Sequence, residues 1–229
     1  MATADDQMLL ETIRAGEYAA FRSLLKDGVN PNASDPGHNS ALFLAVYHGR
    51  REMAKDLIGA GALLDRKGNL GNTPLSLAIV RNDEASVRLL IDHGASLEEQ
   101  DALGDTPLMT ASSLGRGNLA RLLLHAGAAV NGRGAGGRTP LIVAAQNGRA
   151  ALVELLLAQG AAIDRPDAQG ATALVYAVRE GWPGTLSSLV QAGASLHPGG
   201  EQPSVLLLAR NMGRHDLVEL LGELCQCNE

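Results

Sequence analysis

Apolar residues recur at helical spacing in four stretches of the chain, "MAKDLIGAG", "SVRLLIDHG", "LARLLLHAG" and "LVELLLAQG". Each stretch closes on a glycine, the residue that most readily adopts the left-handed conformation found at helix ends. A shorter apolar stretch precedes each of these, and it stops at a glycine or, once, at an asparagine: Gly49, Asn82, Gly115 and Gly148. A fifth short apolar stretch stops at Gly181. The pattern predicts pairs of short helices, each ended by a tight turn.

These helix pairs recur with a fixed period. Similar octapeptides start every 33 residues: "GNTPLSLA" at Gly71, "GDTPLMTA" at Gly104, "GRTPLIVA" at Gly137 and "GATALVYA" at Gly170. A weaker copy, "HNSALFLA", starts at His38, and a last copy, "QPSVLLLA", starts one residue early at Gln202. The glycines that close the second helices keep the same period: Gly28, Gly61, Gly94, Gly127, Gly160 and Gly193.

The period predicts one domain over residues 1–229. Its repeats are expected at about 38–70, 71–103, 104–136, 137–169 and 170–201, between an N-terminal capping repeat at 5–37 and a C-terminal capping repeat at 202–229. No repeat buries its apolar faces alone, so the repeats must stack on one another. The terminal stretches suit capping roles because charged residues interrupt their apolar pattern.

The T-P-L motif explains how the first helix of a repeat begins. Its threonine can cap the helix by accepting a hydrogen bond from an early backbone N–H: Thr73, Thr106 and Thr139. The proline that follows suits the first helical position, where no N–H partner is needed: Pro74, Pro107 and Pro140. The motif therefore predicts the start of each first helix.

From about Leu9 to Leu224 the sequence resembles an ankyrin-repeat protein, because two motifs keep one register throughout. The resemblance implies an all-α repeat solenoid of helix–turn–helix repeats joined by hairpins or loops. One departure concerns T-P-L-H, the usual ankyrin motif, whose histidine position here holds Ser76, Met109, Ile142 and Val175. The threonine–histidine hydrogen bonds of the family are therefore absent, and we expect apolar packing to replace them at the last three positions.

Composition narrows the range of partners. The chain is 45% hydrophobic, which is enough for a sizeable core, and its net charge of -6 opposes nucleic acid or an anionic membrane as the main partner. No apolar run approaches the roughly 20 residues that span a bilayer. The start, "MATADDQMLLETIRAG", does not read as a signal peptide. These features predict a cytoplasmic protein with no membrane or nucleic-acid partner.

One glycine-rich stretch, "VNGRGAGGRTPL", has the G-x-G-x-x-G spacing of dinucleotide sites at Gly132, Gly134 and Gly137. Such a site needs a strand before it, whereas "LARLLLHAGAAVN" predicts a helix and its stop. The register also assigns Gly137 to the T-P-L motif. We therefore interpret the glycines as part of a connection between repeats, with Arg133 and Arg138 still able to hold a phosphate or carboxylate.

No motif predicts catalysis or a cofactor. The six histidines show no paired ligand spacing, and neither a nucleophile elbow nor a P-loop occurs. An acidic loop contains Glu98, Glu99, Asp101 and Asp105. It lacks the EF-hand spacing and is interpreted as a solvated hairpin rather than a cation site. Cys225 and Cys227 are too few for a zinc site and are taken as free thiols, with an intermolecular disulfide or a shared metal site as the alternative.

The ankyrin resemblance implies a binding surface on the concave groove, lined by hairpin tips and by the exposed ends of the first helices. Transferred to this sequence, the predicted partner-binding residues are Tyr47, His48, Leu70, Asn72, Val80, Arg81, Leu103, Asp105, Ser113, Leu114, Arg138, Gln146, Asn147, Arg179 and Glu180. The early repeats carry apolar residues at these positions and the later repeats carry polar ones. We expect an apolar anchor on the early repeats, unless Leu70 and Leu103 pack between adjacent tips.

The sequence thus predicts a non-enzymatic adaptor that binds one protein partner and is monomeric when free. Its richness in alanine, glycine and arginine suggests a bacterial protein. Three roles stay open for such a protein: an immunity or chaperone protein that neutralises a toxin, a secreted effector that binds a host protein, and a scaffolding subunit. An enzyme is the remaining alternative. Trp182 is expected either as a wedge between helices or as a binding hot spot.

Overall fold

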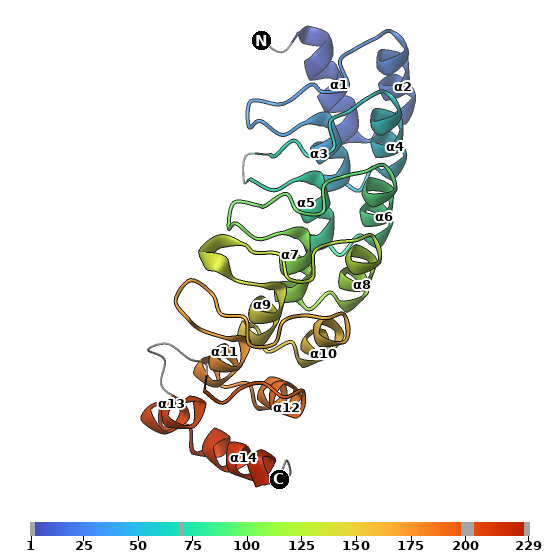
Figure 1. Cartoon of the computed structure of the whole chain (residues 1–229). Helices are drawn as coiled ribbons and strands as arrows, with labels where there is room; N and C mark the ends of the chain where they lie inside the picture. Colours follow the sequence, from blue (N-terminus) through green and yellow to red (C-terminus); the bar gives the residue numbers. More distant parts are fainter. Residues whose placement is uncertain (1–2, 69–70, 198–203, 227–229) are drawn as a thin grey trace. The chain divides into compact units, whose positions relative to one another are not determined.

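The computed structural model describes residues 3–68, 71–197 and 204–226 (Figure 1). This part of the chain forms fourteen α-helices and one short 3-10 helix, η1 (Ala135–Gly137). The α-helices are α1 (Ala4–Ala15), α2 (Tyr18–Lys26), α3 (Ala41–Tyr47), α4 (Arg51–Gly59), α5 (Pro74–Val80), α6 (Glu84–Asp92), α7 (Pro107–Leu114), α8 (Gly117–His125), α9 (Pro140–Gln146), α10 (Ala150–Ala158), α11 (Ala173–Glu180), α12 (Pro183–Gln191), α13 (Val205–Asn211) and α14 (His215–Gln226). The predicted all-α repeat solenoid is confirmed.

The first helices of the repeats begin as the T-P-L motif predicts. Thr73 Oγ1 accepts a hydrogen bond from the backbone N–H of Ser76 at 3.1 Å, and Thr139 Oγ1 accepts one from Ile142 at 3.3 Å. Pro74, Pro107 and Pro140 are the first residues of α5, α7 and α9. Each cap satisfies a backbone donor that the helix itself leaves unpaired.

The predicted helix stops are also confirmed. Backbone φ is positive at the stops of the first helices: Gly49, Asn82, Gly115, Gly148 and Gly181. It is positive as well at the glycines that close the second helices: Gly28, Gly61, Gly94, Gly127, Gly160 and Gly193. The glycines repeated every 33 residues therefore mark the positions where the backbone adopts the left-handed conformation that ends a helix.

Interresidue contacts divide the chain into an N-terminal half, Met1–Pro107, and a C-terminal half, Leu108–Glu229. In the N-terminal half α1, α3 and α5 pack side by side in one layer, and α2, α4 and α6 form a second layer against them (Figure 1). The two layers enclose a core of fully buried side chains that includes Phe21, Leu42, Leu57, Leu75 and Leu90. The single domain over residues 1–229 stays a prediction.

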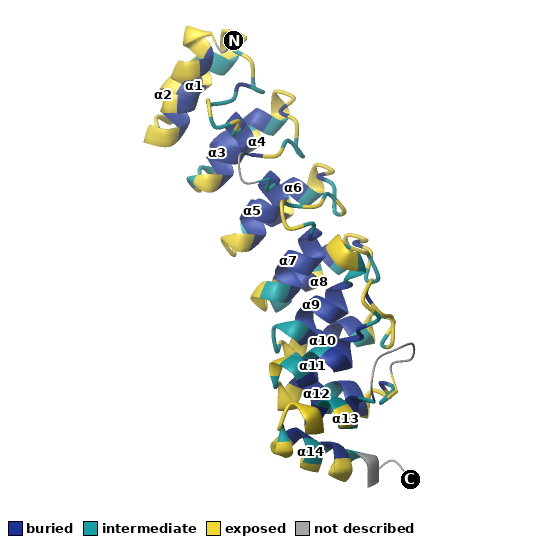
Figure 2. Ribbon diagram, turned by 90° about the vertical axis from the view of Figure 1, so that its left-hand side faces the viewer, coloured by how far each residue is buried: buried dark blue, intermediate teal, exposed yellow. Residues whose placement is uncertain are grey.

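The C-terminal half follows the same plan. Helices α9, α11 and α13 pack in sequence, and α8, α10, α12 and α14 form the layer beside them. Leu141, Leu156, Leu174, Leu189 and Leu217 are among its buried side chains. The first helices α3, α5, α9 and α11 are buried along most of their length, whereas α1 and α13, near the two ends of the chain, are not (Figure 2).

The position that holds histidine in T-P-L-H is part of this core. Met109, Ile142 and Val175 are fully or almost fully buried, so apolar packing replaces the family's polar contact there as expected. Ser76 is also fully buried, and its hydroxyl donates to the backbone carbonyl of Thr73 at 3.1 Å. The one polar residue at this position therefore satisfies its hydroxyl within its own helix turn.

His38 occupies the place where later repeats have the glycine of G-x-T-P, and its φ is 65°. A side chain is strained in this region, whereas glycine is not. We expect His38→Gly to raise the free energy of unfolding by about 0.5–1 kcal/mol, after the extra freedom of glycine in the unfolded chain is subtracted. Urea denaturation measures this change. His38→Ala keeps the Cβ and should bring no gain, and equal effects of the two substitutions would contradict the explanation.

Candidate protein-binding surface

The C-terminal ends of α1, α3 and α5, the first helices of the first three repeats, form one exposed patch in the N-terminal half. We define this α1–α3–α5 patch by Arg14, Tyr47, His48, Val80 and Arg81, which follow one another in the 33-residue register. Helix α3 packs against both α1 and α5, so these helix ends are neighbours. The side chains of Tyr47 and Val80 are 49% and 45% exposed. The patch therefore presents apolar surface on well-packed helices.

Tyr47 is the centre of the patch. Its ring contacts the His48 ring edge-on, with 5.1 Å between ring centroids, and the guanidinium carbon of Arg81 lies 5.5 Å from the Tyr47 centroid. This second distance is typical of a cation–π interaction. Burial, followed by the nearby charges of Arg50, Arg14 and Arg81, holds the pKa of His48 below its ordinary value. The patch is therefore aromatic and cationic, and its imidazole favours the neutral form.

Arg14 in the patch and Arg50 beside it both have partners within the fold. Arg14 Nη2 lies 2.9 Å from Asp35 Oδ2, while Arg50 Nη2 donates to the carbonyl oxygens of Arg14 and Ala15 at 3.3 Å each. Burial alone would raise the pKa of Asp35, but hydrogen bonds from Asn39 and Arg14 outweigh it and hold the pKa below its ordinary value. Arg14 and Arg50 thus have fixed partners within the fold.

The loop positions predicted for binding in the N-terminal half differ in exposure. Leu103 is 72% exposed, so it does not pack between adjacent loop tips, as one alternative expected. Asn72 is half-buried, and its Oδ1 accepts a hydrogen bond from Ser76 Oγ at 3.4 Å. Asp105 is buried, which removes its side chain from any open surface. Leu70 lies outside the described residues.

Three of the residues predicted in the C-terminal half, Arg138, Gln146 and Asn147, form hydrogen bonds within their own repeat. Arg138 Nη1 donates to Gln146 Oε1 at 3.4 Å, and Asn147 Nδ2 donates to the carbonyl of Val143 at 2.9 Å. Leu114 and Glu180 are exposed, and the others are half-buried: Ser113, Arg138, Gln146, Asn147 and Arg179. Residues that satisfy one another in this way gain less from a new partner than exposed apolar ones.

The glycine-rich stretch forms the loop after α8 rather than a nucleotide cradle. The backbone N–H groups of Gly132, Gly134 and Gly137 donate to carbonyls of the same loop at 2.9, 3.0 and 3.0 Å. Arg133 Nη2 reaches into the next repeat and donates to the carbonyl of Pro166 at 2.8 Å. The donors that would hold a pyrophosphate are thus occupied, and a helix rather than a strand precedes them.

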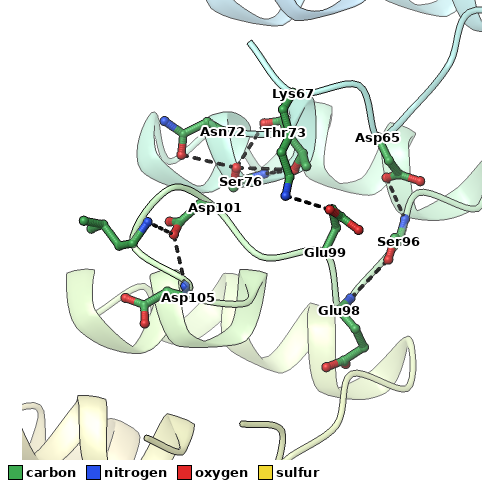
Figure 3. Close-up of polar contacts among 11 residues, drawn as sticks. Asp65, Lys67, Asn72, Thr73, Ser76, Ser96, Glu98, Glu99, Asp101 and Asp105 are labelled. Atoms are coloured by element: carbon green, nitrogen blue, oxygen red, sulfur yellow. Dashed lines mark hydrogen bonds and ion pairs between the residues drawn. The ribbon is translucent and has the colours of Figure 1, made fainter. Parts of the chain in front are cut away.

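The acidic loop has a structural role (Figure 3). Asp101 Oδ1 accepts hydrogen bonds from the backbone N–H groups of Leu103 and Asp105 at 2.8 and 3.0 Å, and Glu99 pairs with Lys67 at 2.7 Å. Asp167 accepts the same two backbone contacts in its own repeat, and Asp35 accepts one of them, from the N–H of Asn39. These aspartates therefore shape the loop turns.

No metal centre emerges from these side chains. Within residues 3–68, 71–197 and 204–226 no group of three histidine, cysteine or acidic side chains lies close enough to hold a metal ion. The Cys225 side chain and Cys227 lie outside the part that the structure describes. The predictions made for these cysteines therefore stay predictions.

Sequence reasoning missed a set of contacts that link successive repeats. The residue after the first-helix stop reaches back and donates to a carbonyl at the end of the previous first helix. This holds for Arg50 to Arg14 and Ala15, Arg149 to Ser113, Trp182 to Gln146, and Arg214 to Arg179. The recurring arginine after the stop was the signal in the sequence. Trp182 is therefore an inter-repeat contact, although 42% of it stays exposed.

Comparison with known families decides the identity of these repeats. Models described as ankyrin repeats match residues 9–58, 42–134 and 129–199. The chain belongs to the ankyrin-repeat family. Ankyrin repeats generally serve as protein–protein interaction modules, and this family is typically non-enzymatic.

Two known proteins show how far the likeness extends. The crystal structure of the human ASB11 ankyrin repeat domain shares 29% identity, with a TM-score of 0.74 over 88% of this chain and 90% of that one. The potassium channel GORK of Arabidopsis thaliana is 39% identical over 67 residues, which make up 29% of this chain and only 8% of the channel. Neither match supports the predicted bacterial origin. Throughout the described residues, no helix of this ankyrin chain is long and apolar enough to cross a membrane.

Proposed function

We propose that this chain is a non-enzymatic ankyrin-repeat adaptor that binds one protein partner through the α1–α3–α5 patch, with Leu103 as a second contact. Large apolar side chains held exposed on rigid elements are typical of protein interfaces. Tyr47, Val80 and Leu103 have this character. Enzymatic activity has no support from any cluster of side chains in the described residues.

The comparison of repeats carries this proposal. Every residue of α3 before Tyr47 is buried, and so is every residue of α5 before Val80. Packing therefore ends just before these two positions. The same position holds Gln146 in α9 and Arg179 in α11, so the fold accepts polar side chains there. The exposed aromatic and apolar residues in the N-terminal half are thus not required by the fold, and a partner explains them.

Affinity capture with matched variants tests this function. Tagged chain is used to capture its partner, and the affinity of that partner is then measured for the Tyr47→Asp, Val80→Asp double variant. We expect the affinity to fall at least about tenfold, because two carboxylates would be buried in an apolar interface. The control is Leu63→Asp, which changes a 60% exposed leucine in the loop after α4. A partner that binds the double variant and the control equally well would refute the proposed site.

A further inference from the structure

The α1–α3–α5 patch is locally cationic, and Arg81 is its exposed charge. The whole chain carries a net charge of -6, yet the charged residues acting on His48 in the patch are the arginines Arg14, Arg50 and Arg81. Arg14 pairs with Asp35, and Arg50 donates to carbonyls at the end of α1. In residues 3–68, 71–197 and 204–226 no carboxylate forms an ion pair with Arg81. Its charge is therefore uncompensated at the surface.

The Arg81 guanidinium contacts the Tyr47 ring, which helps to hold it in place. The guanidinium carbon of Arg81 lies 5.5 Å from the ring centroid, and Arg81 itself is exposed. A guanidinium in cation–π contact with an aromatic face can still donate hydrogen bonds from its N–H groups. Holding the side chain in place before binding also lowers the entropy cost of forming a complex. Arg81 is thus prepared for the two parallel hydrogen bonds that a carboxylate accepts.

The neighbours of Arg81 define the rest of the recognised chemistry. Val80 precedes Arg81 in the chain, and both Val80 and Tyr47 leave about half of their surface open to apolar contact. A basic segment would bring its own charge close to Arg81 and Arg50, which is unfavourable. Charge complementarity therefore favours an acidic segment that also carries an apolar side chain.

We propose that the partner presents an acidic segment, in which an Asp or Glu carboxylate binds Arg81 and an adjacent apolar side chain contacts Tyr47 and Val80. This inference rests on the proposed function, because it names the chemistry of the partner at the same patch. The proposed function requires only an apolar contact with the partner, and this inference adds a preference for a negatively charged partner segment. The occupant is a protein segment, since a long polyanion such as nucleic acid would also meet the negative charge of the remaining chain.

Selection from a library of random short peptides tests the proposal. The immobilised wild-type chain is the bait, and the Tyr47→Asp, Val80→Asp variant removes peptides that bind elsewhere. We expect the selected peptides to be enriched in Asp and Glu beside Leu, Ile or Phe. The affinity of one selected peptide is then measured for the wild type and for Arg81→Glu, Arg81→Lys and Arg88→Glu.

Arg81→Glu should weaken binding of the selected peptide at least about tenfold, and Arg81→Lys should weaken it less, because lysine keeps the charge but not the paired donors. Arg88→Glu is the matched control. It makes the same charge reversal on α6, where Arg88 pairs with Glu84, and it should change the affinity by less than about twofold. Raising the salt concentration from about 0.05 M to about 0.5 M should weaken the wild-type complex, since it shortens the screening length.

The possible failures are distinguishable. Peptides without acidic enrichment that still depend on Tyr47 and Val80 would overturn the acidic partner while leaving the proposed function intact. Equal losses in Arg81→Glu and Arg88→Glu would also overturn it. A library that yields no peptide dependent on the patch would count against both the acidic partner and the proposed function.

Discussion

Replacing Gly71 by alanine is expected to lower the free energy of unfolding by about 3 kcal/mol, from left-handed strain and steric overlap together. Gly71 has a φ of 71°, where an L side chain is strained. A Cβ built at Gly71 would lie 2.7 Å from the Cβ of Ala102 and 3.1 Å from its Cα and N. Because two of these atoms belong to the backbone of the next loop, no side-chain rotation relieves the overlap.

The control for Gly71→Ala is Gly94→Ala. Gly94 also has a positive φ, 87°, but no atom lies within 4 Å of the Cβ it would gain. Only the backbone strain remains there, so we expect a loss of about 1 kcal/mol. Urea denaturation of both variants measures the difference. Equal losses would contradict a steric overlap between the added Cβ and Ala102.

Replacing Trp182 by alanine is expected to cost about 2 kcal/mol, the sum of a lost hydrogen bond and lost packing. Trp182 Nε1 donates to the carbonyl of Gln146 at 3.0 Å, and its ring covers Gly148. Arg149 and Arg214 make the equivalent contacts in neighbouring repeats of the same half. The side chain at this position therefore satisfies a carbonyl at the end of the preceding first helix.

Substitution by arginine separates this structural role from a binding role. We expect Trp182→Arg to stay within about 0.5 kcal/mol of the wild type, because arginine has the required donor and length. The capture assay shows whether Trp182→Arg also keeps the partner. A Trp182→Arg variant as unstable as Trp182→Ala would contradict the equivalence of these positions. A stable Trp182→Arg variant that lost the partner would instead favour the hot-spot interpretation.

The helices were predictable because their signals are local. The caps at Thr73 and Thr139 and the turn at Asn82 depend on residues within a few positions along the chain. The 33-residue register then assigned the same element to every repeat. A single T-P-L motif would have been weak evidence, whereas several copies of the same helix-start and helix-stop motifs at one spacing are strong evidence.

The candidate site was less predictable because it depends on contacts between repeats. The register placed Tyr47 and Val80 correctly at the exposed ends of α3 and α5. It could not show that Asp105 is buried, or that Arg138 and Gln146 contact each other. The contact of Arg81 with the Tyr47 ring, in turn, joins two repeats. Such pairings follow from side-chain directions across the stack, which a one-dimensional pattern does not contain.

Hydrogen exchange of the chain with its captured partner tests the central claim most directly. The amides at the ends of α3 and α5, in residues 45–49 and 78–82, lie where helices open most easily, so a bound partner should slow their exchange markedly. The proposed docking on the α1–α3–α5 patch predicts slowing there and unchanged exchange in α2, α4 and α6. Slowing confined to α2, α4 and α6, or to the C-terminal half, would contradict it.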